Sequence, residues 1–254
     1  MEQIFNLLPS TSHWIVMVFC AILIGFSKTG FSGIGTIVVA IMALAFGAKP
    51  STGLMLPMLC LADIGAIVYY RRSCSWRHLF KLLIWAVVGL FVGIGVDHFV
   101  PTSGFKYLIA SSILIGAFVL LYNETQKKKL ADNGVMHKHW VLALHGVLGG
   151  FTTMVGNAAG PIMSVYLLSV KMPKYLFVGT SAWFFMAINY IKMPLQIWVW
   201  DNIHTKSIFV SLVMIPFILI GSAIGIYVVK TIPESIFRKV VIWITLLSAA
   251  VLLI

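Results

Sequence analysis

Charged residues are scarce in this sequence. Asp, Glu, Lys and Arg make up 10% of the 254 residues, and only seven residues are acidic, whereas a soluble domain carries roughly 25% charged residues. Hydrophobic residues account for 60% of the chain, and the mean hydropathy is +1.01. Water cannot cover so apolar a surface, so the composition excludes an ordinary soluble domain and indicates an integral membrane protein whose first partner is the lipid bilayer.

The motifs of enzymes and of metal or nucleotide sites are also missing. No paired-carboxylate, Ser/His/Asp or His-Glu-x-x-His arrangement is present. The three cysteines (Cys20, Cys60 and Cys74) have no metal or redox spacing, and the seven histidines have no partner spacing for zinc. No Walker A motif occurs either. We therefore expect no enzyme activity, no cofactor, no metal and no ATP-driven pump within this chain.

The net charge of +11 does not indicate a nucleic-acid partner. The basic residues fall between apolar runs and not on one patch, and no RNP, zinc-finger or helix-turn-helix pattern accompanies them. Basic loops beside apolar spans instead set the orientation of membrane proteins.

Ten apolar runs divide the chain and predict an all-α integral membrane fold. A straight helix needs about 20 residues to cross the hydrocarbon core, and the first, sixth and seventh runs are short. Glycine-rich polar stretches at 25–33 and 149–161 interrupt the first two runs and the sixth and seventh. We expect broken or re-entrant helices there, because unpaired backbone at that depth must be buried in protein or line a cavity. The runs are 12–27, 31–48, 52–70, 78–97, 104–122, 139–155, 159–170, 175–199, 206–229 and 236–254.

Basic residues are concentrated in alternate loops. Of the 18 Lys and Arg residues, 14 lie in the odd-numbered loops, three lie in the even-numbered loops, and Lys192 lies inside the eighth run. The positive-inside rule therefore predicts a multi-pass protein of the cell (inner) membrane with both termini outside the cytoplasm. The 14 residues are Lys28, Arg71, Arg72, Arg77, Lys81, Lys127, Lys128, Lys129, Lys138, Lys171, Lys174, Lys230, Arg238 and Lys239.

The second half of the sequence repeats the first. The pattern Gly89-x3-Gly93-x7-Pro101 recurs at an offset of 132 residues, and earlier residues match at an offset of 125, so seven residues are inserted, near 198–205. Each half holds five runs, and an odd number predicts inverted repeats, a common build of secondary transporters. The repeats are 1–122 and 139–254, joined by a polar cytoplasmic linker, 123–138. The matches at 125 are Phe26 with Phe151, Gly35 with Gly160, and Lys49 with Lys174.

Taken in order and in both halves, these motifs resemble the TauE/SafE family of sulfite exporters and related sulfonate carriers. The similarity extends over about residues 14–254. It implies a transporter fold with a sulfur-containing oxyanion or an organic sulfonate as the substrate. The motifs that carry it are Gly25–Gly30, Lys49–Gly53, Leu56–Pro57, Asp63, Tyr70–Arg72, Thr153–Pro161, Tyr166–Leu168, Phe177–Thr180, Trp183–Phe185, Asn189 and Lys192–Pro194.

The two glycine-rich breaks contain groups that suit an anion. An anion that leaves water needs N–H, hydroxyl or amide donors and a cation, and glycine lets the backbone approach a ligand. We expect both breaks to be non-helical and to face one cavity, with Ser32 opposite Asn157 by the offset of 125. The alternative is that the small residues only allow close helix contact. The candidate substrate-binding residues are Ser27, Lys28, Thr29, Ser32, Gly33, Thr152, Thr153, Gly156, Asn157 and Gly160.

Three polar residues lie inside apolar runs, where ionisable groups are costly and usually functional. Asn189 and Lys192 are three residues apart on one helix face and join the substrate-binding candidates. The offset brings Asp63 within one position of Asn189. Asp63 is predicted to carry a coupling proton or to pair with Lys28 or Lys192. The alternatives are a structural ion pair away from the substrate, a Lys192 that extends to the membrane interface, and a Lys28 that is an ordinary cytoplasmic loop charge.

The leading hypothesis is a secondary transporter of a small sulfur-containing anion, with sulfite export first and organosulfonate transport second. The alternative is an anion channel or a membrane subunit of a larger complex, since inverted repeats also occur in channels. The expected soluble partner is the small anionic substrate, and a homo-oligomer is compatible with the sequence.

Overall fold

The computed structural model describes residues 11–99, Tyr107 and 139–251. These residues form helices joined by loops, and none of them forms a strand, which confirms the all-α fold. Apart from Tyr107, the predicted fifth run and the linker lie outside the described residues. The helices are α2 (Thr11–Thr29), α3 (Ile34–Phe46), α4 (Ala48–Tyr70), α5 (Trp76–Phe99), α8 (His139–Gly156), α9 (Gly160–Ser169), α10 (Lys174–Trp198), α11 (Thr205–Val213), α12 (Ile215–Thr231) and α13 (Glu234–Val251).

Large apolar side chains cover the outside of the helix bundle. Leu44 is 89% exposed, Trp198 81% and Trp243 70%, whereas Lys28, Asp63 and several amide and hydroxyl side chains are buried inside it. The helices α2 and α4, and the Trp76–Gly95 part of α5, are long and apolar enough to cross a membrane. An apolar outside with charged and polar side chains buried inside suits a protein surrounded by lipid.

The predicted ninth run, 206–229, is not one helix. The chain bends by 53° between α11 and α12, at Met214. Pro216 lies in the first turn of α12. Proline has no N–H to continue the hydrogen bonds of α11, but it is tolerated in a first turn, where that donor has no partner within the helix. The proline therefore ends one helix and begins the next.

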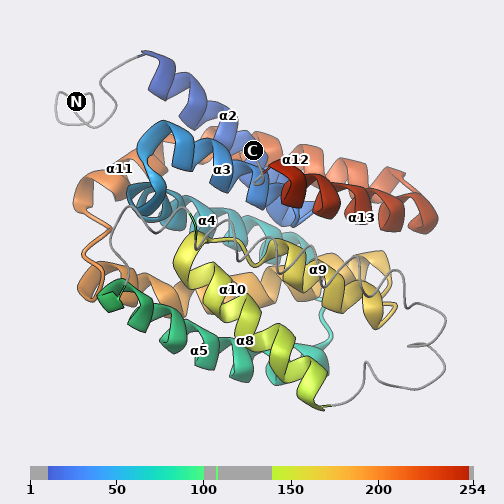
Figure 1. The fold of residues 1–254 in the computed structure, drawn as a ribbon. Coiled ribbons are helices and arrows are strands. Elements are labelled where there is room, and N and C mark those ends of the chain that lie inside the picture. The colour runs from blue at the N-terminus through green and yellow to red at the C-terminus, as the bar shows by residue number, and fades with distance from the viewer. Residues whose placement is uncertain (1–10, 100–106, 108–138, 252–254) are drawn as a thin grey trace.

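The helices are arranged as a central pair between two outer pairs (Figure 1). The helices α4 and α10 contact each other in the centre. On one side α2 packs against α12, and on the opposite side α5 packs against α8. In each outer pair, the first helix of one half (α2 or α8) packs against a helix from the fourth apolar run of the other half (α12 or α5). The two halves therefore interlock.

The close contacts within the outer pairs follow the internal repeat. A Cβ atom added to Gly89 of α5 would overlap the carbonyl oxygen of Val147 in α8, and one added to Gly221 of α12 would overlap that of Ile22 in α2. Gly89 and Gly221 differ by the offset of 132, and Ile22 and Val147 differ by the offset of 125. The two contacts are therefore equivalent, and the halves are related by pseudo-twofold symmetry in the interior of the bundle.

A second pair of contacts repeats the pattern with the roles of the helices exchanged. A Cβ atom on Gly150 of α8 would overlap the carbonyl oxygen of Ala86, and one on Gly25 of α2 would overlap that of Ile218. Because backbone atoms are in the way and cannot rotate aside, only glycine fits at these positions. These glycines hold α2 and α8 close to their partner helices.

We predict that Gly89→Ala lowers the stability of the protein, because the added methyl group would push α5 away from the backbone of α8. Overpacking of this kind typically costs about 1–3 kcal/mol. Gly95→Ala, in the same helix, is the matched control, since nothing lies within 4 Å of the atom it would add. Its higher helix propensity should raise stability by up to about 1 kcal/mol. Thermal unfolding in detergent measures both, and equal melting temperatures would contradict the assigned contact.

Candidate functional site

The two glycine-rich breaks touch each other in the middle of the bundle. The first lies between α2 and α3, at Gly30–Gly33, and the second between α8 and α9, at Asn157–Ala159. A Cβ atom on Gly160 would overlap the carbonyl oxygen of Ser32. The hydroxyl groups of Ser32 and Ser164 are hydrogen-bonded at 3.0 Å. The start of α9 is therefore in direct contact with the end of the first break.

Both breaks are shorter than the sequence predicted. Ser27, Lys28 and Thr29 belong to the last turn of α2, and Thr152 to Gly156 belong to α8. Thr29 donates its hydroxyl to the carbonyl oxygen of Gly25 at 3.0 Å, a bond that a helix accommodates without ending. Helix α8 ends only at Asn157, whose φ of 56° lies in the left-handed region. Polarity alone therefore did not mark the ends of these helices.

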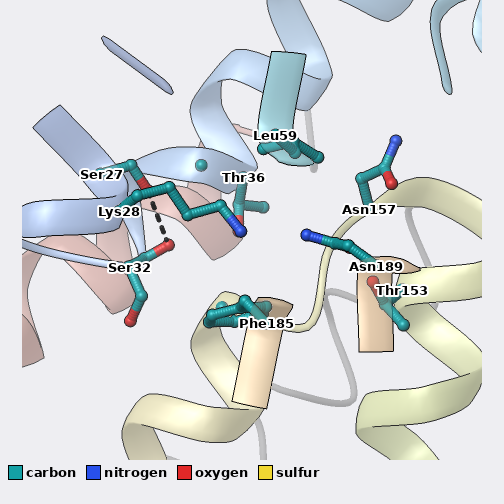
Figure 2. A pocket seen from close by; sticks show the side chains of 11 residues that line it. Ser27, Lys28, Ser32, Thr36, Leu59, Thr153, Asn157, Phe185 and Asn189 are labelled. Carbon is teal, nitrogen blue, oxygen red and sulfur yellow. Dashed lines mark hydrogen bonds between the residues drawn. The ribbon is translucent and has the colours of Figure 1, made fainter. Parts of the chain in front are cut away.

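A cavity lies where the breaks meet, and its wall follows the internal repeat (Figure 2). Four pairs of its lining residues are equivalent in the two halves at offsets of 125 or 126. A cavity built from equivalent pairs lies on the pseudo-twofold axis. The pairs are Lys28 with Thr153, Ser32 with Asn157, Gly35 with Gly160, and Leu59 with Phe185; Ser27, Thr36 and Asn189 complete the lining.

The cavity is small. Its free volume of about 20 Å³ is enough for about one water molecule. An oxyanion with three or four oxygen atoms is larger than one water. The structure therefore represents a compact state, and the breaks must separate before such an ion can enter.

A buried chain of polar groups joins three helices beside this cavity. The ammonium Nζ of Lys28 in α2 lies 2.8 Å from the carboxylate Oδ1 of Asp63 in α4, and the two side chains are 6% and 0% exposed. The amide Nδ2 of Asn189 in α10 donates to Asp63 Oδ2 at 2.7 Å. Figure 2 shows Lys28 and Asn189 reaching into the cavity from different sides. Both oxygens of the carboxylate are thus engaged by residues of the cavity wall.

Phe185 covers the ammonium group of Lys28. The Nζ atom lies 4.3 Å from the centre of the aromatic ring, a distance at which the electron-rich face attracts a cation. The ring therefore stabilises Lys28 and also fills one side of the cavity.

Lys192 is a second buried cation, and the oxygen atoms to which it donates hydrogen bonds are neutral. It is fully buried in α10. Its Nζ donates to the carbonyl and hydroxyl oxygens of Thr153 at 2.9 and 3.1 Å, and to Oδ1 of Asn157 at 2.5 Å. Lys192 does not line the cavity itself, but both of its partners do. It fixes these two side chains and adds its positive charge to the site.

The charges in this region do not cancel. Among the described residues, the buried Asp, Glu, Lys and Arg side chains are Lys28, Lys192 and Asp63. Two cations therefore stand against one carboxylate. An uncompensated charge away from water costs several kcal/mol, so the site favours a negatively charged ligand.

Two loops pack against the central helices α4 and α10, one at each end of the pair. A Cβ atom on Gly53 of α4 would overlap the carbonyl oxygen of Asn202, which follows α10. One on Gly179 of α10 would overlap that of Ser73, which follows α4. The start of each central helix therefore lies beside the end of the other, and α4 and α10 are antiparallel. Leu59 and Phe185, near the middle of the two helices, place the cavity between the loops.

The family of the chain follows from a comparison with family models. The model described as sulfite exporter TauE/SafE matches residues 17–252. The chain belongs to the TauE/SafE family. No curated protein and no solved structure matches it. As a TauE/SafE protein it is a multi-pass membrane protein of a family that transports sulfur-containing anions.

The TauE/SafE structure brings most of the predicted site residues together. The cavity wall contains Ser27, Lys28, Ser32, Thr153, Asn157, Gly160 and Asn189, while Asp63 and Lys192 are hydrogen-bonded or ion-paired to that wall.

Four predicted residues lie away from the cavity. Thr29 donates its hydroxyl to the carbonyl oxygen of Ser222 in α12 at 2.9 Å, so it joins two helices. Gly33 faces α13, Thr152 bonds within its own helix, and Gly156 is the last residue of α8. Thr29 and Gly33 thus contact neighbouring helices, which agrees with the stated alternative for the breaks.

Sequence reasoning missed four residues of the cavity wall: Gly35, Thr36, Leu59 and Phe185. Gly35 and Thr36 follow the first break directly, inside α3. Leu59 and Phe185 are apolar and carry no chemical signal in the sequence. However, each lies four residues before a recognised polar residue, Asp63 or Asn189, so one helical turn along the same face would have found both.

Proposed function

We propose that this TauE/SafE protein is a secondary carrier that moves a small sulfur oxyanion, with sulfite as the first candidate, through the cavity on its pseudo-twofold axis. The observation that carries this proposal is the excess positive charge at the cavity, where Lys28 and Lys192 stand against Asp63 alone. An organic sulfonate is the second candidate, because its sulfonate group presents similar oxygens.

In this proposal the cavity wall replaces the water that the anion loses. Lys28 supplies the charge, and the hydroxyl groups of Ser27, Ser32 and Thr153 with the amide groups of Asn157 and Asn189 supply hydrogen bonds. Asp63 holds Lys28 when no anion is bound and releases it when one enters. Its carboxylate is also the group in this site that can take up a coupling proton.

The small size of the cavity favours a carrier over a channel. Loops cover opposite ends of the α4–α10 pair, at Asn202 and at Ser73, and the space between them is about the size of one water. Inverted repeats allow alternating access, in which one half rocks against the other around a central site. We assign these repeats to residues 1–122 and 139–254, with 123–138 as the linker.

The proposed orientation, with both termini outside the cytoplasm, agrees with the packing of the loops. Ser73, in a loop predicted to be cytoplasmic, lies against the start of α10, which follows another such loop. Asn202, in a loop predicted to be outside, lies against the start of α4. Loops assigned to the same side by their charges thus meet in space, and reporter fusions at the two termini test the assignment.

The test of the proposed function is flux into liposomes that contain the purified full-length protein. We expect saturable exchange of radiolabelled sulfite, handled under argon, and competition by unlabelled sulfite that exceeds competition by sulfate, thiosulfate or small sulfonates. Protein-free liposomes are the control. Preloaded sulfite should accelerate uptake, because a carrier exchanges its substrate across the membrane. Flux without such acceleration would indicate a channel, and no saturable flux of any of these anions would refute the proposal.

A further inference from the structure

A second cavity adjoins the first on the side of the α10 N-terminus. The two cavities share Ser27, Lys28, Ser32 and Phe185 in their walls. The second is completed by Gly30 from the first break and by Phe177, Val178 and Ser181 from α10. Lys28 therefore borders both spaces. It lies between the cavity on the axis and a space nearer the loop that carries Ser73, which packs on Gly179.

Ser181 places an unused hydroxyl group in this second cavity. The residue is only 4% exposed, and its Oγ has no hydrogen-bond partner among the residues that the structure describes. Other buried hydroxyls in helices bond the carbonyl oxygen four residues earlier, and one example is Ser211, which bonds Ser207 at 2.8 Å. A buried hydroxyl without a partner costs about 1–3 kcal/mol. A ligand that accepts its proton would remove that cost.

Thr36 has the same property in the cavity on the axis. It is 1% exposed, and its Oγ1 finds no hydrogen-bond partner within the described part of the chain. One unpaired hydroxyl thus stands in each cavity, and Lys28 borders both. An anion could therefore contact Lys28 in either of two neighbouring positions, with the hydroxyl of Thr36 as a donor in one and that of Ser181 in the other.

The internal repeat shows that Lys28 and Ser32 lack a neighbour that their counterparts in the second half have. The counterparts of Lys28 and Ser32 are Thr153 and Asn157, and in that half the ammonium of Lys192 is bonded to both of them. The residue equivalent to Lys192 at the offset of 126 is Ala66. Ala66 places no ammonium group beside Lys28 and Ser32, so space is left next to these two residues.

We propose that the second cavity is a further anion position, in which Ser181 and Lys28 bind the substrate as it passes between the axial cavity and the α10 N-terminal side. This inference rests on the proposed function and adds to it a path of two positions. The substrate class is the same small oxyanion. Thr36 serves the axial position and Ser181 the second one, so the two hydroxyls have different effects on transport.

The test compares Thr36→Val and Ser181→Ala with Ser211→Ala as the matched control for loss of a buried serine hydroxyl. Equilibrium binding of radiolabelled sulfite and sulfite exchange into liposomes are measured for each full-length variant. We expect Thr36→Val to weaken binding by about tenfold or more, since hydrogen bonds to charged groups contribute about 1.5–3 kcal/mol. Ser181→Ala should slow exchange by about tenfold while binding stays within about twofold, and Ser181→Thr should restore the rate. Ser211→Ala should match the wild type.

The outcomes separate the two proposals. If the wild type and Ser211→Ala exchange sulfite but Ser181→Ala does so at the wild-type rate, the second position is refuted and the carrier function stands. If Ser181→Ala loses binding and exchange in the same proportion as Thr36→Val, the two hydroxyls serve one position and the inference is also wrong. If the wild type carries no anion, the proposed function fails and the second position fails with it. A folded Ser181→Thr variant that remains slow would show that the hydroxyl is not the cause.

Discussion

Lys28→Met is expected to abolish anion binding and to destabilise the protein at the same time. The variant removes the cation that borders both cavities and leaves Asp63 buried without its partner at 2.8 Å. Loss of one member of a buried ion pair costs about 3–5 kcal/mol, because the other charge stays uncompensated. Sulfite binding and thermal unfolding in detergent measure the two effects on the same sample.

The double variant Lys28→Met/Asp63→Asn separates these effects. It removes both charges, so we expect it to regain most of the lost stability while sulfite binding stays absent. Lys28→Arg keeps the charge but replaces a compact ammonium with a planar group. It should therefore fold normally but transport the anion poorly. If the double variant bound sulfite with normal affinity, Lys28 would serve only as the structural partner of Asp63.

Lys192→Met is expected to weaken anion binding with little loss of stability. The wild-type ammonium is fully buried, and its three hydrogen bonds go to neutral oxygens of Thr153 and Asn157. Removal of the charge relieves the cost of its burial, which offsets the lost hydrogen bonds. It also removes positive potential from the site and frees two side chains of the cavity wall. We expect the affinity for sulfite to fall by about tenfold or more.

The control for this variant is Lys206→Met, since Lys206 is an exposed residue at the start of α11. It removes the same charge from the chain but not from the cavity, so binding should stay at the wild-type level. The effect of adding Asp63→Asn should also differ between the two lysines. It should restore stability to Lys28→Met, but it should restore neither stability nor binding to Lys192→Met. An unchanged affinity in Lys192→Met would mean that this lysine only holds α8 against α10.

The internal repeat and the rarity of charge inside apolar runs located the central polar groups in the sequence. The offset placed Asp63 and Asn189 at similar depth, and the structure joins them at 2.7 Å, although this bond itself was not predicted. The predicted pairing of Asp63 with Lys28 or Lys192 is found with Lys28. The same offset placed Ser32 opposite Asn157, and both line the cavity. Ionisable groups inside apolar runs are rare enough to stand out, which is why Asp63 and Lys192 were recognised without any structure.

Other parts of the site could not be predicted from residue types. The partners of Lys192 are on α8, and a single sequence does not show which helix crosses which at that depth. The hydroxyl of Thr29 serves a helix contact, whereas that of Thr36, seven residues later, is free inside the cavity. Composition cannot distinguish these roles, because both depend on the direction of one side chain. The bend at Met214 did have a signal in the sequence, because Pro216 lies inside the apolar run.

The interlocked halves have a consequence for how the protein is made. Helix α2 is synthesised long before its close partner α12, and Thr29 bonds a residue 193 positions later. During synthesis the glycine-rich side of α2 must therefore face lipid, or a temporary neighbour, until α12 has entered the membrane. Contacts so distant in sequence form late. A fragment that ends before α12 would leave α2 without its partner, so chains truncated in the second half should be targets for membrane quality control.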